Sequence, residues 1–242
     1  MNQTWTDFEL IIADNASTDG TQSVAEHWAA ADHRVRYIRH QHNLGSAENH
    51  NCVVRAATGE FFKWVSDDDL YAPELLQRCV EALDARPEIV LAHAGTAFID
   101  ETGRTLGIQG YPLVTDVPSP SERFRSLLYT VGGDDIYGVI RTEVMRRVRP
   151  HGSYHLADRV VVAELALNGR FHQVPEPLYF RRDHPGRTER AETGVRQRCV
   201  KLDPRRRNRW RHPVLRLLVE YVGSYLVVIQ RSPISRAEKL RC

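Results

Sequence analysis

The sequence predicts an α/β protein with a mixed, mostly parallel sheet flanked by helices and a helical extension at its C-terminus. Over residues 8–100, short apolar runs alternate with helical patterns, and this alternation is typical of a sheet covered by helices. The 242 residues are 42% hydrophobic, which is enough to build one substantial core. Residues 188–242 are instead basic and helical in pattern, and we expect them to form the extension.

The first half of the chain contains the alternating strands and helices. Short apolar runs that end in polar residues predict buried strands at 8–13, 35–38, 61–66 and 89–94. Helical patterns predict helices at 24–31, 46–57 and 73–85. The last of these begins at Pro73, and proline is tolerated at the first helical position because its missing N–H has no partner there.

The second half is less regular. A hairpin turn is expected at 98–104, and a loop rich in proline and glycine follows it at 109–120. Asn168 and Gly169 mark the end of one expected helix. The helices expected in this half are 121–129, 157–168 and 214–229, and the strands are 171–174 and 178–182.

Charge and cysteine usage exclude several classes of protein. The net charge of +2 gives no sign of a nucleic-acid partner. Residues 196–216 nevertheless hold nine Lys or Arg and one acid, Asp203, which is either a solvated surface or a patch for peripheral membrane contact. The four scattered cysteines suggest neither zinc nor disulfides, so reduced thiols and a cytoplasmic location are expected. No signal peptide and no spanning run of about 20 apolar residues is visible.

Helix 214–229 has one polar stripe, formed by Arg216, Glu220 and Ser224, on an otherwise apolar cylinder. Such a helix packs on a domain or lies in a membrane interface. If it lies in an interface, the protein is expected at the inner face of a membrane.

Three consecutive aspartates follow the apolar run at 61–66. Asp67, Asp68 and Asp69 repel one another, and strand propensity does not account for them. In an α/β protein they would lie at the carboxyl end of a strand, where ligands bind in open sheets. Carboxylates there suit Mg²⁺ or Mn²⁺, which in turn suits a phosphorylated substrate. The alternative is a solvated acidic turn with Asp69 near a helix N-terminus.

Two further polar segments follow the first two strands. Asp14 stands where the first strand stops, in a position to accept hydrogen bonds from a base or a ribose. Asp19 and Gln22 have capping-box spacing, so we expect Asp19 to be structural. The segment 43–45 predicts a tight turn into a helix that carries Asn49.

With these segments in view, the chain resembles the family-2 glycosyltransferases of the GT-A fold, which is Rossmann-like and uses nucleotide-diphosphate sugars. The resemblance is strong over residues 3–100, weaker to about 185, and thin beyond that. The matching segments are 3–10, 14–21, 43–45, 57–61 and 66–69 with Pro73.

On the donor side, the resemblance implies that Asp14 contacts the nucleotide base and Asp67 the ribose. Asp68 would bind the metal, Mg²⁺ or Mn²⁺. Because the alignment of the three aspartates with the family motif is open by one position, Asp69 is also a candidate metal ligand. His184 would lie near the metal or diphosphate, although a lone histidine in a basic loop is often merely solvated. Asn43, Gly45, Asn49 and Arg182 complete the expected donor-binding residues, the last because guanidinium matches phosphate.

On the acceptor side, the family carries a Glu-Asp pair whose Asp is the general base. Here the first member is Ala157, a departure, and Asp158 is the carboxylate that remains. The alternatives for Asp158 are a helix N-cap or an ion pair with Arg159.

The resemblance implies transfer of a sugar from a nucleotide-diphosphate donor, with UDP as the expected nucleotide. The sugar would go to a hydroxyl of an unknown glycan, lipid-linked or small-molecule acceptor. The transfer would be a metal-dependent, inverting displacement with no covalent intermediate. Residues 1–187 would form the catalytic domain, with a nucleotide-binding part at 1–100 and an acceptor part at 101–187.

The family's first strand and its turn have no counterpart in the sequence. We expect that strand to lie upstream of Met1 and the chain alone to bind nucleotide poorly. The rival is a catalytically inactive remnant that binds a nucleotide or a protein partner. A Mg²⁺-dependent phosphohydrolase is a third hypothesis, but it lacks an evident aspartyl nucleophile or second metal cluster.

Overall fold

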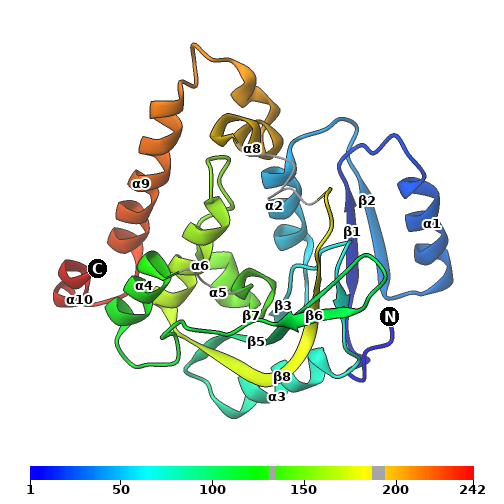
Figure 1. Ribbon diagram of the computed structural model, residues 1–242, viewed down its shortest axis with the longest axis horizontal. Coiled ribbons are helices and arrows are strands. Elements are labelled where there is room, and N and C mark those ends of the chain that lie inside the picture. Colours follow the sequence, from blue (N-terminus) through cyan, green and yellow to red (C-terminus); the bar gives the residue numbers. More distant parts are fainter. Residues whose placement is uncertain (131–133, 187–193) are drawn as a thin grey trace.

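The computed structural model describes residues 1–130, 134–186 and 194–242 (Figure 1). Its strands are β1 Leu10–Asp14, β2 Val35–Arg39, β3 Phe61–Phe62, β4 Leu70–Tyr71, β5 Ile89–Ile99, β6 Thr105–Ile108, β7 Val139–Arg141 and β8 Arg170–Arg182. Its helices are α1 Thr21–Ala31, α2 Ser46–Ala56, α3 Leu75–Ala85, α4 Pro120–Tyr129, η1 Asp135–Tyr137, α5 Thr142–Arg147, α6 Ala157–Asn168, α8 Val195–Leu202, η2 Pro204–Arg207, α9 Val214–Arg231 and α10 Arg236–Arg241.

The larger sheet has the strand order β3-β7-β5-β8-β4, with β6 added on β5. Its centre is the long parallel pair of β5 and β8, while β3, β4, β6 and β7 all pair antiparallel. The expected α/β fold with a mixed sheet flanked by helices is confirmed (Figure 1). Parallel pairing is less frequent than expected, because the four short strands β3, β4, β6 and β7 all pair antiparallel. For β6 the cause is local, since it returns directly from β5 through a tight turn.

Strands β1 and β2 form a separate, parallel two-stranded sheet in the described part of the chain. Helix α1 lies on the outer side of this pair (Figure 1). Glu9 ties the start of β1 to the end of α2, because its carboxylate accepts hydrogen bonds from the backbone N and the hydroxyl of Thr58 at 2.6 Å. Glu9 therefore attaches the two-stranded sheet to the segment between α2 and β3.

Two strands differ from their expected lengths. The apolar run 61–66 is a strand only at β3, and beyond it the buried Trp64 ring packs edge-on against Phe62, with the ring centroids 4.9 Å apart. The two strands expected at 171–174 and 178–182 are one strand, β8. The pairing of β8 with β5 shifts register around Pro175 and Pro177, and a bulge is where a strand accepts proline.

The hydrophobic core lies on both faces of the larger sheet and extends to the C-terminal helices. One cluster joins the sheet to α6 through Leu91, Leu165 and Phe171. A second joins α4, α6 and α9, and includes Phe124 and Val228. The expected helix at 214–229 is thus confirmed as α9, and one of its faces packs on the domain. The domain boundary expected at 187–188 lies outside the described residues.

Candidate active site

Asp14 is the last residue of β1, as expected, and its carboxylate is buried. One oxygen accepts hydrogen bonds from the Tyr37 hydroxyl at 2.6 Å and from Arg39 at 2.5 Å, and the other accepts from the backbone N of Ser17 at 2.7 Å. Burial alone would raise the pKa of Asp14, but these hydrogen bonds and the Arg39 charge lower it to about 2. Asp14 therefore remains ionised and fixes the turn after β1.

The asparagines form a network between the ends of β1 and β2. Asn49 donates to the Ala13 carbonyl at 2.9 Å, and its side-chain oxygen lies 3.1 Å from His40 Nε2. The Asn43 side chain accepts from Asn15 at 3.0 Å and from the backbone N of Gly45 at 2.8 Å. The structure therefore brings together the residues expected at the donor end. Sequence reasoning missed the role of Asn15, although it directly follows Asp14.

Gly45 is needed for two separate reasons. Its φ of +88° favours glycine. A Cβ at this position would also lie 2.3 Å from the carbonyl oxygen of Leu202, at the end of α8. The C-terminal extension therefore lies directly over the start of α2, and the Gly45 backbone is buried beneath it.

The three aspartates lie in the connection between β3 and β4 and have different surroundings. Asp67 is exposed. Asp68 accepts a hydrogen bond from the Ser66 hydroxyl, and its other oxygen lies 3.0 Å from His184 Nε2. Asp69 is buried and accepts hydrogen bonds from the Tyr179 hydroxyl and, at 2.8 Å, from the backbone N of Arg182. The end of β8 thus brings His184 and Arg182 to the aspartates, as expected.

Arg182 holds this connection in place. Its guanidinium donates to the carbonyl oxygen of Asp68 at 2.9 Å and to those of Asp100 and Glu101 at 2.9 and 2.8 Å. The side chain expected to pair with phosphate is therefore bound to the backbone of two loops.

Lys63 is a residue of this region that sequence reasoning missed. Its ammonium donates to the Tyr137 carbonyl and lies 4.7 Å from the centre of the Tyr71 ring. Burial lowers the pKa of Lys63 to about 8, while the charges of Asp69 and Asp134 act in the opposite direction. The available signal was a lone cation inside an apolar run, which indicates a buried partner.

Asp68 and His184 are the side chains with the chemistry to hold a divalent cation. Within the described ranges there is no group of three or more His, Cys, Asp or Glu side chains that could do so. A pair nevertheless fits Mg²⁺ or Mn²⁺ that also binds substrate phosphates, because such sites use one or two protein ligands. Both oxygens of Asp69 are engaged, so it fits this role less well.

Asp158 lies in the first turn of α6 and is half-buried. The N-cap of α6 is Leu156, and the Arg159 guanidinium donates to the carbonyls of Leu127 and Thr130. Neither structural alternative for Asp158, the N-cap or the ion pair with Arg159, is therefore realised. Its carboxylate has no hydrogen bond or ion pair with any other described residue, and its negative charge acts on His151 and His155.

Solved structures of glycosyltransferases have the same fold. Staphylococcus aureus TarS, residues 1–349 in complex with UDP, superimposes with a TM-score of 0.66 at 18% identity, covering 98% of this chain and 61% of that one. A mannosyltransferase of Pyrobaculum calidifontis with GDP-Man and Mn²⁺ gives 0.55 at 16% identity, covering 98% and 59%. These likenesses place the chain in the GT-A class of folds.

The family follows from the sequence comparisons. The family model "Glycosyl transferase family 2" matches residues 1–152, and the chain belongs to this family. It is 30% identical over 105 residues to the putative glycosyltransferase EpsH of Bacillus subtilis, covering 43% of this chain and 30% of EpsH. It is 33% identical over 104 residues to a Campylobacter jejuni GalNAc(5)-diNAcBac-PP-undecaprenol beta-1,3-glucosyltransferase, covering 42% and 32%. The chain therefore spans about a third of these relatives.

Proposed function

We propose that residues 1–187 transfer a sugar from a UDP-sugar to a hydroxyl acceptor, with inversion at the anomeric carbon and with a bound Mg²⁺ or Mn²⁺. The observation that carries this proposal is that His184 Nε2 lies 3.0 Å from Asp68 Oδ2, although the two residues are 116 positions apart in the sequence. UDP and UDP-GlcNAc in the TarS structures and Mn²⁺ in the mannosyltransferase support the choice of ligands.

The proposed reaction is one displacement. The acceptor oxygen bonds to the anomeric carbon, the bond from that carbon to the diphosphate oxygen breaks, and the electron pair leaves with UDP. Asp158 takes the proton of the acceptor hydroxyl, because that hydroxyl is a weak nucleophile near neutral pH. A divalent cation on Asp68 and His184 would stabilise the negative charge that develops on the leaving diphosphate.

The remaining site residues position the donor. Asp14, Asn43 and Asn49 keep the ends of β1 and β2 in one conformation, against which the nucleoside would bind. Gly45 permits the turn into α2. Asp67 is exposed and is available to the ribose hydroxyls.

The loop that carries the metal-binding side chains is held in place by its neighbours. Arg182 and Asp69 hold Asp68 through the hydrogen bonds described above, and the nearby Lys63 ammonium offsets the charge of Asp69. Such residues act by pre-organising the side chains that touch the substrate.

Titration calorimetry of UDP with and without Mn²⁺ tests the metal site. We expect Mn²⁺ to strengthen UDP binding at least about ten-fold, and Asp68→Asn to lose that gain, because a phosphate-bridging cation needs its carboxylate. Asp84→Asn, which changes an exposed aspartate on α3, is the matched control. Equal Mn²⁺ dependence of Asp68→Asn and the control would contradict the assignment.

The second candidate is a protein that binds a nucleotide or a partner without transfer. The separation of β1 and β2 from the larger sheet favours it, because a nucleotide site across two unpaired sheets is less rigid. Release of UDP from a UDP-sugar, dependent on Asp158, would exclude this candidate.

We also propose that α9 attaches the protein to an anionic membrane surface. Leu215, Val219, Val222 and Leu226 lie on one face of α9 and are each 60–73% exposed, which is unusual for a solvated helix. Trp210 precedes this helix and is 97% exposed, among exposed arginines. Apolar and cationic groups in this arrangement match an anionic lipid interface. No described helix is long and apolar enough to cross a bilayer.

Cosedimentation with vesicles tests this attachment. We expect binding to vesicles containing phosphatidylglycerol at low salt and about ten-fold less to pure phosphatidylcholine, because each basic residue near the surface contributes about 1 kcal/mol. The double variant Leu215→Ser, Val222→Ser should bind at least about ten-fold more weakly. Val24→Ser, on an exposed apolar residue of α1, should bind like the parent. Equal binding to both kinds of vesicle, or by both variants, would remove the proposal.

A further inference from the structure

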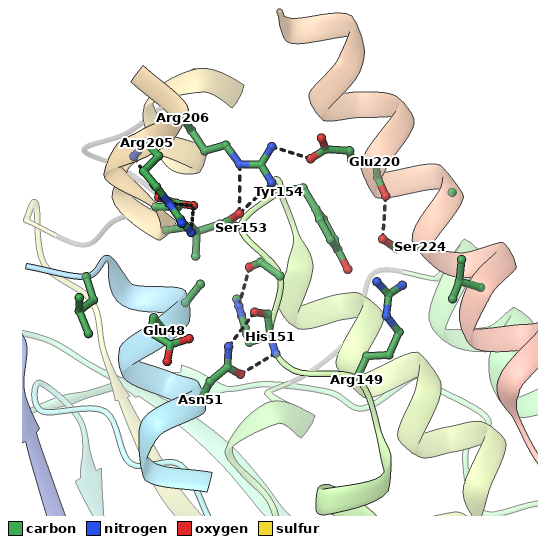
Figure 2. Close-up of a pocket in the computed structure, with 17 residues that line it drawn as sticks. Glu48, Asn51, Arg149, His151, Ser153, Tyr154, Arg205, Arg206, Glu220 and Ser224 are labelled. Carbon is green, nitrogen blue, oxygen red and sulfur yellow. Dashed lines mark hydrogen bonds and ion pairs between the residues drawn. The ribbon is translucent and has the colours of Figure 1, made fainter. Parts of the chain in front are cut away.

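A cavity of about 540 Å³ lies between α2, the segment 149–154, η2 and α9 (Figure 2). Its volume is within the range of small-molecule sites. The wall is mixed in character, since apolar side chains such as Leu44 and Val227 alternate with hydroxyl and charged groups.

Most charges in this cavity are paired. The Arg206 guanidinium donates to the Ser153 hydroxyl at 3.0 and 2.9 Å and forms an ion pair with Glu220 at 2.7 Å. Arg205 pairs with Asp203 at 3.0 Å. Glu48 pairs with Arg55 at 2.5 Å, outside the cavity. Each of these lining charges therefore has an ion-pair partner, and that of Glu48 lies outside the cavity.

Arg149 is the exception. Its backbone N donates to Glu164 at 2.9 Å, but its guanidinium has no hydrogen bond or ion pair with any described residue. Figure 2 shows this guanidinium pointing into the cavity, below Tyr154 and Ser224. A half-buried guanidinium is a strong donor of paired hydrogen bonds to carboxylate or phosphate.

Neutral groups surround this cation. Hydroxyls come from Ser153, Tyr154 and Ser224. Asn51 is committed to the backbone of His151 at 2.7 and 3.0 Å. Burial, with the neighbouring His50, lowers the pKa of His151 to about 4, so this imidazole is neutral near pH 7. A compact polyhydroxylated molecule with one negative charge therefore matches the cavity better than a neutral or cationic one.

His151 also connects the cavity to the proposed base. Its ring stacks on His50 of α2 at 5.4 Å, and the Asp158 charge acts on its pKa. The segment 149–154 that lines the cavity leads directly into α6, whose first turn carries Asp158, and this places an occupant on the acceptor side.

We propose that the cavity binds an acidic carbohydrate, a uronate or a sugar phosphate, whose carboxylate or phosphate is held by Arg149, and that this is the acceptor class of the enzyme. The assignment as acceptor rests on the proposed function. Binding in the cavity does not.

Titration of glucuronate, glucose 6-phosphate and glucose into the chain tests the binding without a donor. We expect both acids to bind at least about ten-fold more tightly than glucose, and Arg149→Gln to remove the difference. Arg125→Gln, at an exposed arginine of α4 outside the cavity, should stay within about two-fold of the parent. Arg149→Lys keeps the charge and should retain part of the preference, which separates loss of charge from loss of folding. The proposed site would be overturned if the acids bound no more tightly than glucose, or if Arg149→Gln kept the preference for acids. Displacement of the acids by UDP would also overturn it.

Transfer assays with the same sugars test the assignment as acceptor. With a UDP-sugar present, glucuronate should accept at least about ten-fold better than glucose, and Arg149→Gln should lose that preference while UDP binding is unchanged. If the acids bind but UDP is never released from any UDP-sugar, the proposed function fails and the cavity remains. If transfer occurs without preference for acids, the acceptor assignment fails and the proposed function remains.

Discussion

The donor and acceptor sides of the candidate site differ in how their polar groups are used. At the donor end, Asp14 and Asn43 are saturated by bonds within the protein. On the acceptor side, the Asp158 carboxylate and the Arg149 guanidinium make no hydrogen bond or ion pair with a described residue, although their charges act on His151 and Glu164. A saturated network holds one shape before substrate arrives, whereas uncommitted charges are groups that a substrate can satisfy. Rigid positioning and unpaired charge are therefore found in different parts of the candidate site.

The largest expected effect is on the reactive side. Asp158→Asn removes the proposed base and should lower the rate of transfer about 10²–10⁴-fold, because general-base catalysis contributes that much. The thermal midpoint and UDP affinity should stay near the parent values, since Asp158 has no described partner. A rate within ten-fold of the parent would show that Asp158 does not take the proton of the acceptor hydroxyl.

On the rigid side, Gly45→Ala should lower the free energy of unfolding by about 3 kcal/mol or more, because Gly45 has a glycine-only backbone conformation and a Cβ there would clash with Leu202. Gly103→Ala is the matched control, because its φ is also +88° but nothing lies within 4 Å. It should cost about 1 kcal/mol. Denaturant unfolding measures both, and equal costs would mean that the Leu202 contact contributes nothing.

The smallest expected effect is the acid sensitivity of Asp14. Its pKa falls from 3.8 to about 2 on folding, which corresponds to about 2 kcal/mol of stability. Because the pKa of Asp14 is lower in the folded protein, its contribution to stability is fully present at pH values above the unfolded-state pKa. This contribution is lost as the pH falls from about 5 towards 2. Stability of Asp14→Asn should therefore depend less on pH across this window. A parallel pH dependence in both proteins would show that the donor end is not held by this charge.

The sequence was most informative where the pattern was local. Helices α2, α3, α6 and α9 were expected within a few residues of their bounds, because apolar periodicity and end signals are local features. His184 was expected near the aspartates from the resemblance to a family, and Arg182 was expected at the donor because guanidinium matches phosphate. The structure brings these residues together.

Features that depend on distant parts of the chain were not predictable. Trp64 interrupts the expected strand because it fills the core, which local propensity does not reveal. Tyr179 contacts Asp69, and Lys63 contacts Tyr137, only because β8 and η1 fold next to the aspartates. The partners of Asp14 come from a neighbouring strand, so neither its burial nor its lowered pKa could be derived from the residues beside it.

The contact of Gly45 with Leu202 has a consequence for synthesis of the protein. The turn at Gly45 leaves the ribosome early, but its covering carbonyl belongs to α8, which is made much later. Domains generally fold from the N-terminus during synthesis, and contacts between distant residues form last. A nascent chain therefore leaves the turn at the start of α2 without its covering carbonyl until Leu202 emerges, and the surroundings of Gly45 are complete only after the extension is translated.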